Sequence, residues 1–262
     1  MSSSFKVVVP ARYASTRLPG KPLADIGGVP MIVRVAERAV QSGADEVIVA
    51  TDDERVLAAV TAAGGRASMT RSDHVSGSDR IMEVAESAGW PADAVVVNVQ
   101  GDEPLIPPAV ISQVAGLLLD DPDVGVATLC ERIGDLGRVF DPNVVKVVGG
   151  HDGFARYFSR APIPYARDAF PGARSGGPPH GPVPEPDGWF RHIGIYAYRV
   201  AALRQFVSLP QGRLERLEAL EQLRLVEYGI GIRLAVAAEP VPIGVDTPGD
   251  LARVQEALAL GD

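Results

Sequence analysis

Alternation between short apolar runs and amphipathic helical segments over the first 130 residues constrains the fold of this 262-residue chain more than any other feature. The apolar runs are FKVVVP, EVIVATDD, ASMT, AVVVNVQGDEP and VGVATLC. The predicted helices between them begin at Pro30, Glu54, Ser78 and Pro108. Strand–helix alternation of this kind builds right-handed βαβ units. The sequence therefore predicts an α/β fold with a mostly parallel sheet and helices on both faces.

The second half of the chain departs from this alternation. NVVKVVGG, FARYFSR and RHIGIYAYR are typical of strands but have no long helices between them, which predicts a mixed or antiparallel extension. Residues 171–188 are rich in proline and glycine and are predicted to be a flexible loop. A long helix is expected from Leu214 to Tyr228. We expect one domain over residues 1–262, with 133–212 as an inserted strand and loop extension.

Composition excludes several classes of protein. A net charge of −8 and a pI near 5.1 argue against general nucleic-acid binding. The single cysteine, Cys130, excludes a disulfide framework and lies in an apolar run where a buried thiol is expected. No apolar stretch approaches the roughly 20 residues that span a bilayer, and the first residues lack a signal-peptide pattern. These features predict a soluble cytoplasmic protein.

Three cations follow the first predicted strand. Arg12, Arg17 and Lys21 lie in the loop PARYASTRLPGKPL, at the carboxyl edge where α/β folds bind ligands. They suit a triphosphate, although a solvated basic loop would give the same composition. Neither the P-loop spacing nor G-x-G-x-x-G is present, which excludes the usual mononucleotide and dinucleotide motifs.

Acidic residues follow two other predicted strands. Asp102 and Glu103 end the run VNVQGDEP, and Asp246 lies in GVDTP before the last helix. Carboxylates at such positions hold Mg²⁺ together with substrate phosphates. Taken alone, Asp246 also suits the N-cap of a helix that begins near Pro248.

Eight motifs, in order, make a family resemblance. They are PARYASTRLPGKPL, TRSDHVSGSDR, VNVQGDEP, FDPNVVKVV, YFSRAPIP, RHIGIYAYR, LEALEQLR and GVDTP. Over residues 5–258 the chain resembles the 3-deoxy-manno-octulosonate (Kdo) cytidylyltransferase family, also called CMP-Kdo synthetases. The resemblance implies a Rossmann-like nucleotidyltransferase fold, a smaller mixed-strand dimerisation extension and a homodimer. It also implies Mg²⁺-dependent transfer of CMP from CTP to a small acidic acceptor, at the 2-hydroxyl of Kdo, with release of pyrophosphate.

The resemblance also implies roles for individual residues. The expected nucleotide-binding residues are Arg12, Arg17, Lys21, Ser76, Gly77 and Gln100. The expected acceptor-binding residues are Gln100, Arg160, His192, Tyr196, Glu221 and Gln222. Asp102 and Asp246 would ligate Mg²⁺, and with Arg12 and Lys21 they form the expected catalytic group.

Simpler readings remain open for some of these residues. Gly77 also suits a helix-entry turn, and His192 and Tyr196 share a strand face that could only pack against the sheet. On the helix predicted from Leu214, Glu215 and Glu218 are expected to form a solvated face.

Two departures from the family pattern leave the acceptor open. SGSDR replaces the usual SGTDR, and Tyr165 stands where tryptophan is common. A small phosphonate such as phosphonoformate is therefore the alternative acceptor. A nucleotide-binding regulator without activity is disfavoured because both aspartates and Lys21 are present.

Overall fold

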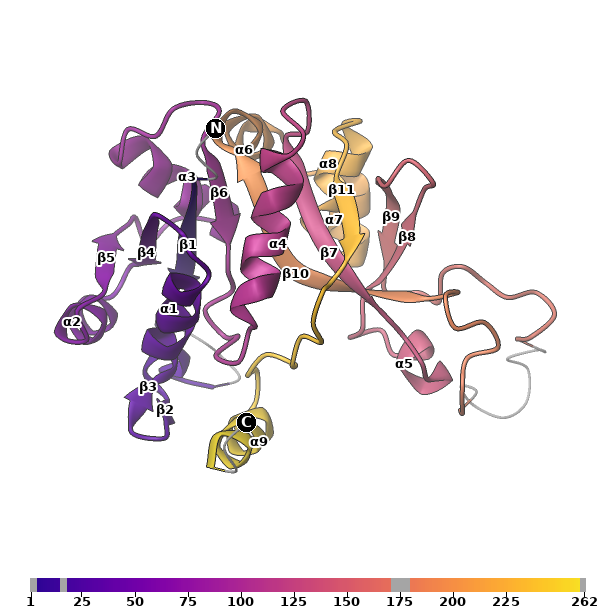
Figure 1. The fold of residues 1–262 in the computed structure, drawn as a ribbon, viewed down its shortest axis with the longest axis horizontal. Coiled ribbons are helices and arrows are strands. Elements are labelled where there is room, and N and C mark those ends of the chain that lie inside the picture. The colour runs from indigo at the N-terminus through magenta and orange to yellow at the C-terminus, as the bar shows by residue number, and fades with distance from the viewer. Residues whose placement is uncertain (1–3, 15–17, 171–179, 260–262) are drawn as a thin grey trace.

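The computed structural model describes residues 4–14, 18–170 and 180–259, and a nine-stranded sheet forms its centre (Figure 1). The strands of this sheet are β1 (Phe5–Ala11), β4 (Glu46–Thr51), β5 (Arg66–Met69), β6 (Val95–Asn98), β7 (Val126–Arg132), β8 (Lys146–Gly149), β9 (Ala155–Ser159), β10 (Phe190–Arg199) and β11 (Arg233–Val236). A two-stranded hairpin pairs β2 (Asp25–Ile26) with β3 (Val29–Pro30).

The helices fall largely where the sequence pattern predicts them. The longer ones are α1 (Met31–Gln41), α2 (Glu54–Ala62), α3 (Gly77–Ser87), α4 (Pro108–Leu119), α6 (Val200–Ser208) and α9 (Pro248–Ala259). The shorter ones are α5 (Leu136–Phe140), α7 (Arg213–Glu218), α8 (Leu223–Glu227) and one 3₁₀ turn, Lys21–Leu23.

The sheet confirms the predicted α/β class and is mixed in direction. The order of its strands is β11–β7–β10–β6–β1–β4–β5. Strand β8 also pairs with β10, and β9 pairs with β8. Strands β6, β1, β4 and β5 are parallel neighbours, as the alternation predicts. The antiparallel strand β10 lies between β6 and β7, so it brings residues from the second half of the chain beside the first β-α units.

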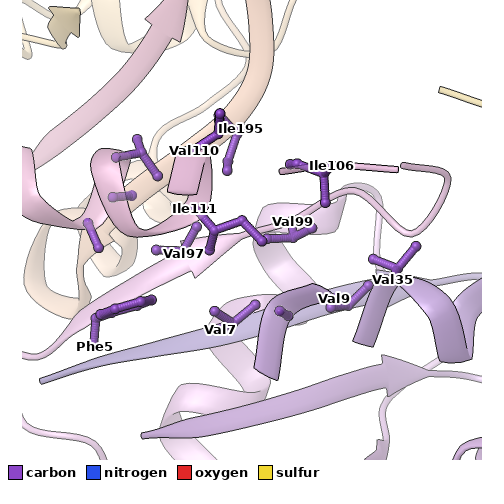
Figure 2. Close-up of a cluster of buried hydrophobic side chains, with 14 of the residues drawn as sticks. Phe5, Val7, Val9, Val35, Val97, Val99, Ile106, Val110, Ile111 and Ile195 are labelled. Carbon is purple, nitrogen blue, oxygen red and sulfur yellow. The ribbon is translucent and has the colours of Figure 1, made fainter. Parts of the chain in front are cut away.

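Two apolar clusters cover the two faces of the sheet. Val7, Val9 and Val97 pack against α1 and α4 on one face, which Figure 2 shows in close-up. Val8 and Val96, the intervening residues, pack against α3 and α6 on the other face. Burial of alternate residues on both faces explains why these strands read as continuous apolar runs.

The segment predicted as an extension divides between two places. Strand β10 lies in the middle of the sheet between β6 and β7, whereas β8 and β9 extend the same sheet from the first residues of β10, and α5 projects beside them at one end of the molecule (Figure 1). A separate small core holds α5 to this projection and contains Ile133, Leu136, Val139, Phe170 and Trp189. Residues 171–179 of the predicted flexible loop lie outside the described residues.

The long helix predicted from Leu214 to Tyr228 is wrong, because the chain breaks between α7 and α8. Ala219 ends α7 in the left-handed region, with φ 50° and ψ 50°. A side chain costs energy in this conformation, so neighbouring contacts must hold it. The break places Glu221 and Gln222 in a turn, so the directions of their side chains are not set by a helix.

Two expectations from composition can be compared with the structure. Cys130 is buried, and burial raises the pKa of its thiol to about 12, which agrees with an inert core cysteine. Across the described residues we find no helix whose length and apolar character would let it cross a membrane.

Lys146 is a fully buried cation whose partners are all backbone carbonyls. Its ammonium donates to the carbonyl oxygens of Asp141 at 2.8 Å, Val144 at 2.6 Å and Arg160 at 2.7 Å. Three donors therefore meet three acceptors that belong to different parts of the projection. Lys146 therefore has a structural role, because its hydrogen bonds connect these segments.

We expect Lys146→Met to lower the free energy of unfolding by about 2–4 kcal/mol, because three buried carbonyls lose their donor. Urea unfolding followed by circular dichroism measures the change. Lys6→Met is the matched control, since Lys6 makes only a 3.6 Å pair with Asp45 at the surface and should matter by less than about 1 kcal/mol. Equal midpoints for the two variants would contradict the structural role of Lys146.

Candidate active site

A cleft of about 400 Å³ lies at the carboxyl ends of the parallel strands β1 and β6. Its lining includes Arg12 and Lys21 after β1, Gln100 and Asp102 after β6, and Asp246 before α9. The two loops approach so closely that a Cβ on Gly101 would lie 2.8 Å from the carbonyl oxygen of Pro10, which only glycine avoids. The tertiary fold thus joins three motifs that are far apart in the sequence.

Lys21 lies between the two predicted metal ligands. Its ammonium donates to Asp102 Oδ2 at 2.6 Å and to Asp246 Oδ1 at 2.9 Å. The lysine side chain is largely buried, with 14% exposure. The two carboxylates therefore already hold one cation in common. A pair of carboxylates that share a cation is a donor set suited to Mg²⁺ when substrate phosphates complete the coordination.

The alternative reading of Asp246 as a helix cap is wrong. Thr247 makes the cap instead: its Oγ1 accepts from the backbone N–H of Asp250, whose carboxylate accepts from the N–H of Thr247 at 2.7 Å. The N–H of Val245 donates to the carbonyl oxygen of Asp102 at 2.8 Å. This bond holds the Asp246 loop against the Asp102 loop, and the Asp246 carboxylate faces Lys21.

Of the other predicted nucleotide-binding residues, Arg12 lines this cleft, whereas Ser76 and Gly77 do not. Arg12 is exposed, and its guanidinium donates to the carbonyl oxygen of His74. Ser76 caps α3 through a reciprocal pair of hydrogen bonds with Asp79. Gly77 begins α3, where a Cβ would lie 3.6 Å from the Pro10 side chain, an ordinary contact that supports the helix-entry reading. Arg17 lies outside the described residues.

A second cavity, of about 190 Å³, shares Gln100 with this cleft. Five of the six predicted acceptor-binding residues line it: Gln100, His192, Tyr196, Glu221 and Gln222. Strand β10 supplies His192 and Tyr196, and the turn between α7 and α8 supplies Glu221 and Gln222. Gln100 Nε2 donates to the carbonyl oxygen of Gly194 at 3.1 Å, which joins the loop after β6 to β10.

Burial sets the protonation of the groups in this cavity. It lowers the pKa of His192 to about 3, so the imidazole is neutral and bonds the Thr128 hydroxyl at 3.1 Å. It also raises the pKa of Glu221, although the hydroxyls of Ser76 and Ser78 and the Arg224 guanidinium favour the carboxylate. A neutral imidazole and a carboxylate can hydrogen-bond hydroxyl groups but bring no positive charge to an anion.

Two residues that the sequence analysis links to the acceptor, Arg160 and Tyr165, do not line this cavity. Arg160 does not line it; the guanidinium donates to the carbonyl oxygens of Glu218 at 2.7 Å and Pro142 at 2.9 Å. Tyr165 lies at the surface of the projection and donates to the carbonyl oxygen of Phe170 at 3.1 Å.

The solvated face predicted for Glu215 and Glu218 is wrong. Glu215 is buried and accepts two hydrogen bonds from Arg224, while Glu218 accepts from the Ser159 hydroxyl at 2.6 Å. Both carboxylates hold the broken helix against its neighbours, because a chain that leaves the helical path must fix its turn through side-chain contacts.

The cavity contains residues that the sequence reasoning missed. Asn98, Tyr198, Phe206 and Leu220 also line it. Asn98 carried a signal, since a single amide interrupts the apolar run AVVVNV. Phe206 and Leu220 carried none, because buried apolar residues are ordinary core in any fold.

The fold and the cleft define an α/β nucleotidyltransferase. A nucleotidyl transferase from Methanothermobacter superposes with a TM-score of 0.57 over 99% of both chains at 15% identity, a likeness of fold alone. The chain belongs to the cytidylyltransferase family, whose model matches residues 6–233.

Relatives with curated names give a finer comparison. The 3-deoxy-manno-octulosonate cytidylyltransferase of Hahella chejuensis is 52% identical over 257 residues, 98% of both chains. Its counterpart in Alcanivorax borkumensis is 55% identical over 258 residues, 97% of this chain and 98% of the relative. A solved CMP:2-keto-3-deoxy-manno-octonic acid synthetase complexed with CTP superposes with a TM-score of 0.86 at 46% identity, over 98% of this chain and 99% of the other.

Proposed function

We propose that this chain transfers CMP from CTP to the 2-hydroxyl of Kdo and releases pyrophosphate. The observation that carries the proposal is a pair of cavities that share Gln100, one with Lys21 and two carboxylates and the other with neutral and anionic hydrogen-bonding groups. The relatives named for this reaction, at 52% and 55% identity over nearly full length, support it.

The geometry supports a division of labour between the two cavities. The cleft with Lys21 and Arg12 receives the triphosphate, where cations offset the charge that gathers on the departing pyrophosphate. The second cavity positions the acceptor so that its hydroxyl meets the α-phosphorus near Gln100, the residue common to both. The new bond joins the acceptor oxygen to the α-phosphorus, the bond to the β-phosphate oxygen breaks, and no side-chain nucleophile takes part.

Mg²⁺ is part of the proposal, with Asp102 and Asp246 as its protein ligands. Two carboxylates that share one cation in the structure support this assignment. When bound, Mg²⁺ lowers the pKa of the attacking hydroxyl and shields the charge of the α-phosphate. Asp102 and Asp246 would hold such an ion in place of Lys21, and the oxygens of a triphosphate would then accept hydrogen bonds from the Lys21 ammonium.

A homodimer in the cytoplasm completes the proposal. The family resemblance supports the dimer, and an acidic chain with one buried cysteine suits a reducing compartment. Light scattering after size-exclusion chromatography measures the mass directly, and a value near 27.6 kDa would contradict the dimer.

Pyrophosphate release with a panel of substrates tests the proposed reaction. CTP with Kdo should give release, and ATP or GTP should give little, because the chain belongs to the cytidylyltransferase family. The acceptor arms are Kdo, 8-amino-Kdo, sialic acid and phosphonoformate. Release with phosphonoformate but not with Kdo would keep the reaction and overturn the acceptor.

Glu221→Ala should raise the KM for Kdo or lower kcat by about 10- to 100-fold, because a half-buried carboxylate facing the acceptor is lost. The KM for CTP should change little. Steady-state kinetics with each substrate varied in turn measures both. Glu227→Gln is the control on α8, away from the cavity, and a similar acceptor effect in that variant would contradict the role of Glu221.

A further inference from the structure

Asn98 is a buried amide at the end of an otherwise apolar strand. Its exposure is 6%, and its Oδ1 has no hydrogen-bond partner among the residues that the structure describes. The three residues before it, Val95, Val96 and Val97, are buried and apolar. A buried polar atom without a partner destabilises the folded chain. A role in packing therefore does not explain an amide at this position.

Two other buried polar atoms in the same cavity also lack hydrogen-bond partners in the described part of the chain, although one of them, Glu221 Oε1, lies 3.9 Å from the Arg224 guanidinium. They are the hydroxyl of Tyr196 and Oε1 of Glu221. Tyr196 lies directly opposite Asn98 in the antiparallel pairing of β10 with β6. Three such atoms around one cavity indicate a ligand that supplies the missing hydrogen bonds.

The identity of these atoms restricts the ligand. An amide oxygen and a carboxylate oxygen both accept hydrogen bonds, so the ligand must donate at least two. Hydroxyl groups donate, whereas the oxygens of an ionised phosphonate only accept. The triphosphate is also excluded as the partner of Asn98, because Asn98 lines the second cavity and not the cleft with Lys21.

We propose that Asn98 determines acceptor specificity by accepting a hydrogen bond from a hydroxyl of a polyhydroxylated acceptor. This inference rests on the proposed cytidylyl transfer and deepens it. It names the residue that discriminates a sugar acid from a small anion whose oxygens only accept hydrogen bonds. A site built to bond a hydroxyl rejects ligands that lack one, because its own polar atoms then stay unpaired.

Asn98→Leu and Asn98→Ala test the proposal with two apolar side chains of different size. Leucine removes the amide and keeps most of the volume, whereas alanine removes the amide and leaves space. Both variants should raise the KM for Kdo about tenfold or more and leave the KM for CTP within about twofold. The melting temperature of Asn98→Leu should equal or exceed that of the unchanged enzyme, because the variant no longer buries a polar oxygen without a hydrogen-bond partner.

Thr51→Val is the matched control. Thr51 is a fully buried polar residue of the same sheet, at the end of β4, and lies outside the acceptor cavity. Its variant should leave the acceptor KM unchanged. Kdo analogues that each lack one hydroxyl extend the test. The analogue without the hydroxyl that meets Asn98 should lose turnover in the unchanged enzyme and lose nothing further in Asn98→Ala.

The outcomes separate this inference from the function on which it rests. If the unchanged enzyme releases no pyrophosphate with CTP and Kdo, the proposed function fails. If it does, and Asn98→Ala keeps the acceptor KM or merely melts earlier, the assignment of Asn98 fails alone. Asn98→Ser replaces Asn98→Leu if leucine prevents folding, with the same criterion on KM.

Discussion

Asp102→Asn and Asp246→Asn should each lower kcat by about 100-fold or more while the chain stays folded. Both carboxylates contact the Lys21 ammonium, at 2.6 and 2.9 Å, in the cleft that we assign to the triphosphate. Asparagine keeps the size of each side chain and removes the charge that would hold Mg²⁺. Steady-state pyrophosphate release at saturating CTP and Kdo measures the loss, and circular dichroism verifies the fold.

Thr247→Ala provides the matched control for Asp246. Thr247 and Asp250 form the reciprocal cap of α9, so the alanine variant should lose about 1 kcal/mol of stability and keep its rate. The roles would be reversed if Asp246→Asn lost stability and kept its rate. That result would restore the capping role of Asp246 and contradict the metal site.

Lys21→Met should lower kcat by about 100- to 1,000-fold, because the ammonium that offsets charge on the leaving pyrophosphate is gone. The same variant should bind Mg²⁺ more tightly in the absence of CTP. In the unchanged protein Lys21 lies between the carboxylates and competes with a metal ion for them. Without it, two carboxylates face each other and a divalent cation relieves their repulsion.

A thermal-shift titration with MgCl₂ and no nucleotide measures this competition independently of activity. The melting temperature of Lys21→Met should rise with Mg²⁺ more than that of the unchanged protein, since a ligand of the folded state stabilises it by mass action. The triple change Lys21→Met, Asp102→Asn, Asp246→Asn should lose the response. Equal responses in Lys21→Met and the unchanged protein would show that Lys21 does not occupy the proposed metal position.

Prediction from the sequence was most successful where local pattern decides structure. The βα alternation of the first 130 residues, the helix that begins near Ser78 and the buried Cys130 all appear in the structure. Apolar periodicity and capping are properties of a few neighbouring residues, so a single chain displays them. The family resemblance, carried by short motifs, then identified residues that line both cavities.

The failures have a common cause in long-range contacts. Leu214 to Tyr228 has helical periodicity throughout, but contacts of Glu215 with Arg224 and of Glu218 with Ser159 hold the break at Ala219. Ser159 comes from another segment, and Arg224 lies nine residues after Glu215, beyond the break. Helical propensity is a weak preference that such contacts override. The break also places Glu221 in the lining of the second cavity, to which we assign the acceptor.

The sequence by itself determined the fold class, the strand ends that carry the charged loops, and the residue types available for phosphate, metal and hydroxyl binding. Only the tertiary structure decided that Asp246 faces Lys21 and Asp102 while Thr247 caps the helix. It also decided that Asn98 lies in the second cavity, with an oxygen that has no hydrogen-bond partner among the described residues. Both depend on β6, β10 and the segment before α9 meeting in space, and no pattern among neighbouring residues encodes a meeting of distant segments.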